Sequence, residues 1–262
     1  ILDASTLGKI DIQGSDASEF LNRVYTNAWS KLGIGKCRYG LMLNEDGMVY
    51  DDGVTTRLGE NHYVMTTTTG GAANVLSKLE DYLQTEWPEL DVYLTSVTDH
   101  FATATIGGPN SKKILNKLIP DLDLSDENFP HMSFKEEKIG KINCRIMRIS
   151  FTGELSYEIN IQASYGKSLW EQCMDAGKEF NITPYGTETM HLKKPTKTKT
   201  IPTHNPHRNT VYHKTALSNA LNKPPCPQNF QVEKKKRQME WHLTVKQKPI
   251  QMCQSRNLAA TF

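Results

Sequence analysis

The segment from Cys37 to Thr56 constrains the fold more than any other part of the chain. It reads CRYGLML, then NEDG, then MVYDDGVTT, so an acidic turn ending in Gly47 joins two apolar runs. Such a turn between runs of β-forming residues is typical of an antiparallel hairpin. We therefore expect at least one antiparallel sheet in this protein.

The rest of the chain repeats a pattern of strands interleaved with helices. Alternating or β-branched runs predict strands over residues 8–14, 62–69, 92–99, 101–108, 141–151 and 153–162. Apolar residues at helical spacing predict helices over residues 15–25, 70–87, 109–119 and 166–180. Because hairpins outnumber helical crossovers, the pattern indicates an α+β fold rather than a doubly wound parallel sheet.

Two adjacent carboxylates, Asp51 and Asp52, lie inside one of the predicted strands. Asp is depleted in strands, and a buried ionised carboxylate is costly unless a partner satisfies it. The default interpretation is an edge strand whose acids face solvent. Alternation places Asp52 on the face of Tyr50 and Asp51 on the opposite face, and both faces carry apolar neighbours. This arrangement favours a ligand site for at least one Asp.

Three further segments are weaker candidates. Glu158 lies within a predicted strand after the turn at residues 152–154, where a solvent-facing side chain is the simpler interpretation. The Gly70–Gly71 pair could cradle a phosphate, but it fits no nucleotide-binding motif and more often marks a tight turn. The ring of Tyr39 could stack on a planar ligand, although core packing is the commoner role.

Charge divides the chain into two parts. Residues 1–191 hold 17 Lys or Arg against 27 Asp or Glu, whereas residues 192–262 hold 14 Lys or Arg against two Glu. The second part also lacks Gly and Asp and carries seven of the twelve prolines. A basic tail can bind nucleic acid, but its composition indicates a disordered segment, and we expect no nucleic-acid partner.

Several classes of protein are excluded by what the sequence lacks. The five cysteines have no CxxC spacing, so we expect free thiols in a reducing cytoplasm and neither disulfides nor a zinc site. The eight histidines form no metal-binding motif, and we expect no metal. No run of 18 apolar residues occurs, so we expect no membrane association. The start at Ile1, without Met, suggests a fragment of a longer protein.

Four separated segments together resemble the aminomethyltransferase family, the T-proteins of glycine cleavage. They are, in order, DASTLGKIDIQGSDASEFLNRVYTN (residues 3–27), GKCRYG through GGA (35–72), IGGPNSKKIL (106–115) and RISFTGELSYEINI (148–161). Residues 25–43 and 182–191 are most similar to the version of this domain in the α subunit of heterotetrameric sarcosine oxidase. The resemblance covers about Ile1 to His191.

This resemblance implies a T-protein-like folate-binding fold of two interleaved sheet-and-helix subdomains, at about residues 1–94 and 95–191. The family's C-terminal β-barrel has no counterpart after His191, so we expect a truncated domain followed by a tail, residues 192–262, foreign to the family. The implied ligand is tetrahydrofolate. FAD, FMN and NAD would belong to other parts of an intact sarcosine oxidase.

The resemblance also implies particular site residues. Asp52 matches the second Asp of the family's DD pair, at the reacting nitrogens of the folate, and is the candidate catalytic residue. Glu158 matches the strand Glu that holds the pterin ring. Tyr39 matches a family aromatic, Leu7 stands where T-proteins often have Met beside the pterin, and Tyr157 is the neighbouring aromatic candidate. Asp51 is then expected to be satisfied by solvent or by the hairpin.

The implied function is capture of the one-carbon unit released when sarcosine is oxidatively demethylated, which forms 5,10-methylenetetrahydrofolate. The other subunits of that enzyme would be its partners. Three alternatives remain open. The first is a stand-alone glycine-cleavage aminomethyltransferase that works with a lipoyl carrier protein. The second is a folate-binding module without transferase activity, and the third is a fragment that does not fold stably and has no activity.

Overall fold

Two antiparallel five-stranded sheets form the centre of the protein. The computed structural model describes residues 1–189, so the tail predicted from residue 192 onward lies outside the described residues. The first sheet has the order β3-β4-β5-β2-β6, and the second has the order β1-β7-β10-β9-β8. The strands of the first sheet are β2 (Gly8–Gln13), β3 (Cys37–Leu43), β4 (Val49–Gly59), β5 (His62–Thr67) and β6 (Tyr93–Ser96). Those of the second are β1 (Leu2–Asp3), β7 (Phe101–Gly107), β8 (Ser133–Ile139), β9 (Ile142–Arg148) and β10 (Ser156–Gln162).

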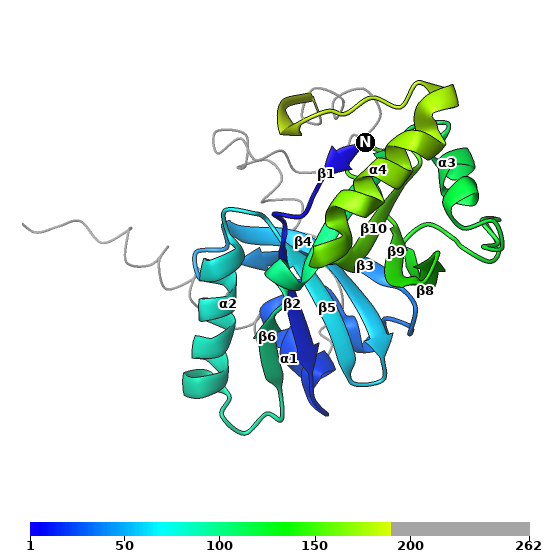
Figure 1. Cartoon of the computed structure of the whole chain (residues 1–262). Coiled ribbons are helices and arrows are strands. Elements are labelled where there is room, and N and C mark those ends of the chain that lie inside the picture. The colour runs from blue at the N-terminus through cyan, green and yellow to red at the C-terminus, as the bar shows by residue number, and fades with distance from the viewer. Residues whose placement is uncertain (190–262) are drawn as a thin grey trace, which may run out of the picture.

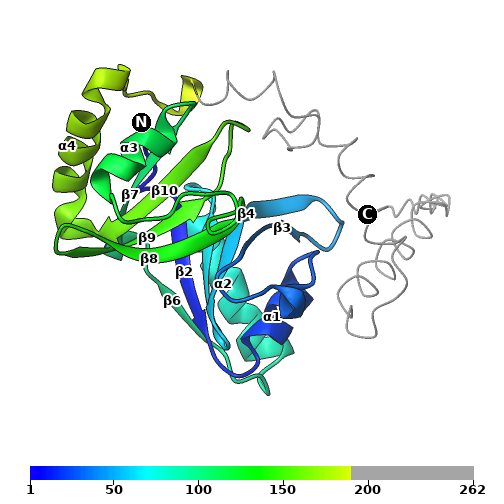
Figure 2. The same cartoon turned by 90° about the vertical axis from the view of Figure 1, so that its right-hand side faces the viewer.

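Four α-helices cover the outer faces of the two sheets (Figures 1 and 2). They are α1 (Ala17–Val24), α2 (Ala72–Asp81), α3 (Ser111–Leu118) and α4 (Gly166–Gly177). One core lies between the first sheet and α1 and α2, with Phe20, Val75 and Met65 fully buried. The second core lies between the other sheet and α3 and α4. The predicted α+β fold is therefore confirmed.

The inner faces of the two sheets meet each other. A small third core joins them, with Cys37 of β3 against Met147 of β9 and with Val54 of β4 at its border. The Thr56 hydroxyl lies 3.2 Å from the Cys37 sulfur and 3.3 Å from the Met147 sulfur. The protein thus has four layers, helices, sheet, sheet and helices, and the space between the sheets is bounded by strands on both sides.

Two strands have no counterpart among the predicted elements. β1 has only two residues, too few to show the alternation of a strand in the sequence. It pairs with β7, which is distant from it in the sequence. β8 has the sequence SFKEEKI, whose four consecutive charged residues hide the alternation of an edge strand. The helix predicted over residues 70–87 is shorter in the structure, where α2 covers Ala72–Asp81. It is followed directly by one π-helical turn, Tyr82–Glu86.

Candidate functional site

Asp52 and Tyr39 are hydrogen-bonded to each other on the hairpin of β3 and β4. The Tyr39 hydroxyl donates to Asp52 Oδ2 at 2.6 Å, and both side chains are partly buried. Burial, and then the negative charge of Asp52, raise the pKa of Tyr39 well above its ordinary value. The hydroxyl therefore remains protonated at neutral pH and remains the donor in this pair.

The side chain of Asp52 lies on the face of the first sheet that meets the second sheet. Residues 52, 54 and 56 share a face because side chains alternate along a strand. Thr56 contacts Met147 of the second sheet, and Val54 packs against the cluster that contains Met147. Asp52 therefore borders the space between the sheets.

Glu158 borders the same space from the other side. In the antiparallel register of β10 and β9, Glu158 lies directly opposite Met147, so their side chains share a face. The Met147 side chain on that face contacts the Thr56 hydroxyl of the first sheet. The structure thus brings Asp52, Tyr39 and Glu158 to the inter-sheet space, from two different sheets.

Burial makes the Glu158 carboxylate unusual. Loss of solvent raises its pKa to about 7, and the ammonium of Lys9 only partly opposes this rise. Within residues 1–189, no donor is hydrogen-bonded to the carboxylate. A carboxylate accepts hydrogen bonds and donates none when ionised, so Glu158 is suited to a ligand that offers N–H groups.

Lys9 lies next to this carboxylate at the start of β2. Lys9 is 2% exposed, and its Nζ donates to the carbonyl oxygens of Ser5 at 3.0 Å and Leu7 at 2.9 Å. Burial lowers the pKa of Lys9, and Glu158 is the main charge opposing that shift. The backbone carbonyl of the partly buried Leu7 is thus held beside the Lys9 ammonium, and contact of the Leu7 side chain with a ligand stays a prediction. Sequence reasoning missed Lys9 because a Lys in an alternating strand is normally interpreted as solvent-facing.

Tyr157 is not brought to the inter-sheet space. It precedes Glu158 in β10 and so points to the opposite face, where it is fully buried among the residues under α3 and α4. Its ring lies 5.9 Å from that of Phe129. Tyr157 therefore packs in the core behind β10, while Asp52, Tyr39 and Glu158 lie on the inner faces of the sheets.

Asp51 has a structural environment that the sequence did not predict. It is 3% exposed, and its carboxylate accepts the Thr68 hydroxyl at 2.6 Å and the Thr68 N–H at 3.3 Å. The Thr68 hydroxyl also accepts the N–H of Gly71, at the start of α2. The expectation that solvent satisfies Asp51 is wrong, because this face of β4 is covered by the loop before α2.

A β-bulge changes the predicted alternation of the hairpin. The register moves from Met42–Asp51 to Leu43–Val49, so Tyr50 is an extra residue in β4. Its hydroxyl donates to the Asn74 carbonyl of α2 at 3.3 Å. The predicted shared face of Tyr50 and Asp52 is therefore wrong, since a bulge interrupts the period of two.

Residues 1–189 contain neither a metal-binding cluster nor a membrane-spanning helix. No group of three or more His, Cys, Asp or Glu in this range is placed to hold a metal ion. No helix in the same range is long and apolar enough to cross a membrane. Cys37, Cys144 and Cys173 are buried free thiols, and burial raises the pKa of each.

Comparison with known proteins defines the class to which this fold and site belong. The family model for the GCVT N-terminal domain matches residues 1–221, a range that extends past the predicted boundary at His191. In structure, the chain is similar to the glycine cleavage system aminomethyltransferase T of Bartonella henselae, with a TM-score of 0.58 and 22% identity. That similarity covers 71% of this chain and 46% of the other, and it supports the T-protein-like fold.

Sequence relatives show the same family. The chain is 58% identical over 193 residues to the sarcosine oxidase α subunit of Corynebacterium sp. strain P-1, which is 73% of this chain and 20% of that protein. It is 33% identical over 187 residues to the aminomethyltransferase of Thermoanaerobacter sp. strain X514, which is 71% of this chain and 49% of that protein. The chain belongs to the GCVT N-terminal domain family. It spans about a fifth of the one relative and about half of the other.

Proposed function

We propose that this domain binds tetrahydrofolate between its two sheets and presents it to a one-carbon donor. The observation that carries the proposal is the position of Asp52 and Glu158, two carboxylates that border one space from facing sheets. Tetrahydrofolate would supply the nitrogen atoms that receive the one-carbon unit and give 5,10-methylenetetrahydrofolate.

Glu158 is the proposed pterin-binding residue. The ring of a pterin offers N–H donors, and an ionised carboxylate offers only acceptors, so the two are complementary. The absence of a hydrogen-bonding partner for Glu158 within residues 1–189 leaves its oxygens available to such a ligand. Leu7 would supply an apolar contact beside the ring.

Asp52 is the proposed catalytic residue. A carboxylate close to a reacting nitrogen can accept its proton or stabilise positive charge as it develops. Tyr39 donates to one carboxylate oxygen, and this hydrogen bond fixes the orientation of the group. The ring of Tyr39 would also form part of the wall against the folate.

The sarcosine oxidase context is the favoured one. Identity to sarcosine oxidase α subunits, at 58%, exceeds identity to aminomethyltransferases, at 33%. In that context the one-carbon unit comes from oxidative demethylation of sarcosine, the partners are the other subunits of the enzyme, and the setting is the cytoplasm. FAD, FMN and NAD would be held elsewhere in the assembly.

The alternatives are separable by simple observations. A dinucleotide-binding domain encoded upstream of Ile1 favours sarcosine oxidase. A start codon immediately before Ile1 favours a stand-alone aminomethyltransferase that uses a lipoyl carrier protein. Binding of tetrahydrofolate without formation of 5,10-methylenetetrahydrofolate in the intact assembly would indicate a non-catalytic module.

Titration of the 262-residue chain with tetrahydrofolate, followed by ligand fluorescence, tests the site. We expect Glu158→Gln to weaken binding about 10- to 100-fold, because a hydrogen bond to a charged group contributes about 1.5–3 kcal/mol. Asp52→Asn should also weaken binding. Asp46→Asn, in the exposed turn of the same hairpin, should bind as the wild type does. Equal affinity of the wild type and the two site variants would contradict the assignment.

A further inference from the structure

The outer edge of β3 is held by the segment that follows α1. β3 is an edge strand of its sheet, so one side of its backbone has no neighbouring strand there. Tyr25 forms an isolated antiparallel bridge with Met42, and the Thr26 N–H donates to the Leu41 carbonyl at 3.2 Å. Residues 25–28 therefore act as a short partial strand along this edge.

Asn27 continues this pairing with its side chain. Asn27 Nδ2 donates to the Tyr39 carbonyl at 2.8 Å, so a side-chain amide replaces a backbone donor at that position. The Thr26 hydroxyl donates to Asn27 Oδ1 at 3.0 Å, which orients the amide with its NH₂ toward β3. The Arg38 guanidinium donates to the Ala28 carbonyl and adds a contact beside it.

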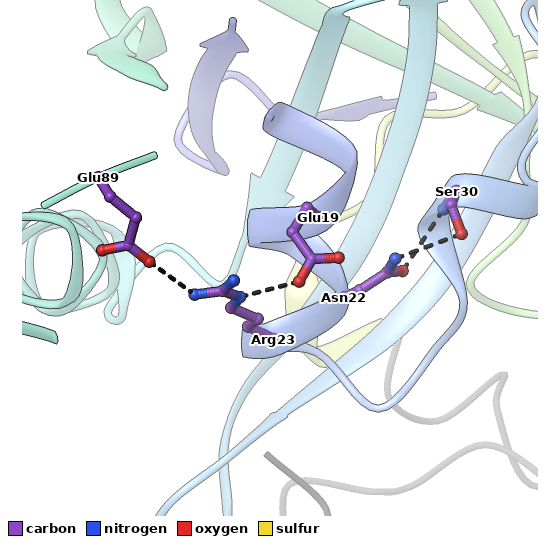
Figure 3. A network of polar contacts seen from close by, with 5 residues as sticks. All are labelled: Glu19, Asn22, Arg23, Ser30 and Glu89. Atoms are coloured by element: carbon purple, nitrogen blue, oxygen red, sulfur yellow. Dashed lines mark hydrogen bonds and ion pairs between the residues drawn. The ribbon is translucent and has the colours of Figure 1, made fainter. Parts of the chain in front are cut away.

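The segment is itself anchored to α1. Asn22 Oδ1 accepts the Trp29 N–H at 2.5 Å. Asn22 Nδ2 also donates to the Ser30 hydroxyl at 3.3 Å (Figure 3). The Trp29 ring packs so closely on β3 that a Cβ added at Gly40 would lie 2.6 Å from it. The chain on both sides of Asn27 is therefore held against the strand.

The anchoring helix is in turn braced on its exposed side. Arg23 of α1 donates to Glu19 at 2.9 Å and to Glu89 at 3.3 Å (Figure 3). Its guanidinium also lies 5.3 Å from the centre of the Trp87 ring. These contacts hold α1 against the segment after α2. The segment that carries Asn27 is therefore attached to a helix whose position is restrained.

We infer that Asn27 is a positioning residue for the candidate folate site, acting through Tyr39. Its amide fixes the backbone of β3 at the residue whose hydroxyl reaches Asp52 at 2.6 Å on the inner face. The expected effect of Asn27 on folate affinity rests on the proposed function. The claim that Asn27 positions Tyr39 against Asp52 does not, because it concerns only the contacts among these three residues.

The positioning is tested without folate, by the ¹³C NMR signal of Tyr39 Cζ in the full chain. The Asp52→Ala variant gives the reference chemical shift of Tyr39 Cζ when the Tyr39 hydroxyl has lost the carboxylate that accepts its hydrogen bond. Asn27→Ala should move the signal in the same direction, and so should Asn27→Asp, which keeps the shape but has no N–H donor. Asn128→Ala removes an exposed amide donor near Asp123 and should leave the signal unchanged. An unchanged Tyr39 signal in both Asn27 variants overturns the inference.

The functional consequence is tested by tetrahydrofolate affinity in a double-mutant cycle. We expect Asn27→Ala to raise the dissociation constant about 3- to 10-fold, the range for loss of one neutral hydrogen bond. In a Tyr39→Ala background the same change should have no further effect, because the hydroxyl and the ring through which Asn27 acts are both absent. Losses that multiply in the double variant overturn the inference. Absence of saturable binding to the wild type would refute the proposed function, while the NMR comparison would still decide the role of Asn27.

Discussion

Asp51 and Asp52 are neighbours in β4 whose carboxylates serve opposite faces of the sheet. Asp51 is 3% exposed and binds Thr68 before α2, whereas Asp52 meets Tyr39 at the border of the inter-sheet space. Alternation along the strand separates two residues of identical chemistry. One carboxylate stabilises a local turn, and the other lies beside the inter-sheet space where we propose that the ligand binds.

The raised pKa of Glu158 predicts that folate affinity depends on pH. The ionised carboxylate is the form that accepts pterin N–H groups, and protonation becomes appreciable as the pH falls through about 7. We expect tetrahydrofolate to bind about tenfold more weakly at pH 6 than at pH 8, since one proton must leave before binding. Fluorescence titrations at the two pH values measure this ratio.

The matched control for that prediction is Glu158→Gln. The amide does not titrate in this range, so the variant should bind weakly at both pH values with little change between them. A wild-type affinity that is constant from pH 6 to pH 8, or that improves as the pH falls, would contradict the role given to Glu158.

The element that shapes the site is β4 together with the two strands beside it. The Thr66 hydroxyl of β5 accepts the Val54 N–H at 3.0 Å and donates to the Val54 carbonyl at 3.1 Å. Backbone pairing of β4 with β5 begins only at Thr55. A Cβ at Gly53 would lie 1.9 Å from the Thr66 carbonyl, so only glycine fits there. Asp52 thus lies where β4 separates from β5 and remains paired with β3.

The contribution of the loop before α2 to the stability of the fold can be tested by mutation. Thr68→Val removes the hydroxyl that donates to the buried Asp51 carboxylate, and we expect it to lower the free energy of unfolding by about 1–3 kcal/mol. Thr69→Val changes an exposed neighbour and should stay within about 0.5 kcal/mol of the wild type. Urea unfolding followed by circular dichroism compares them, and equal losses would contradict the buried role of Asp51.

At the scale of the whole molecule, much of the architecture follows from the sequence because hairpins and amphipathic helices are local. The turn at residues 44–47 and the helical spacing after Gly71 predict β3, β4 and α2 directly. The meeting of two sheets is not local, since a period of two shows which residues share a face but not what covers that face. The buried position of Lys9 is a consequence of that meeting.

In the candidate site, too, some features could be predicted from the local sequence, and others depend on contacts between distant segments. Asp52, Glu158 and Tyr39 were expected from resemblance, and the structure brings them to one space from two sheets. The opposite orientation of Tyr157 could have been predicted, because adjacent strand residues point to opposite faces. The bulge at Tyr50 could not, since the sequence gives no signal for the extra residue in the register.

The measurement that tests the central claim most directly is a crystal structure of the chain with tetrahydrofolate bound. We predict that the pterin lies between the two sheets with its N–H groups about 2.7–3.2 Å from the Glu158 carboxylate. The reacting nitrogens should lie beside Asp52, with Tyr39 and Leu7 in contact with the ligand. Folate bound on an outer face, under the helices or away from both carboxylates would contradict the account.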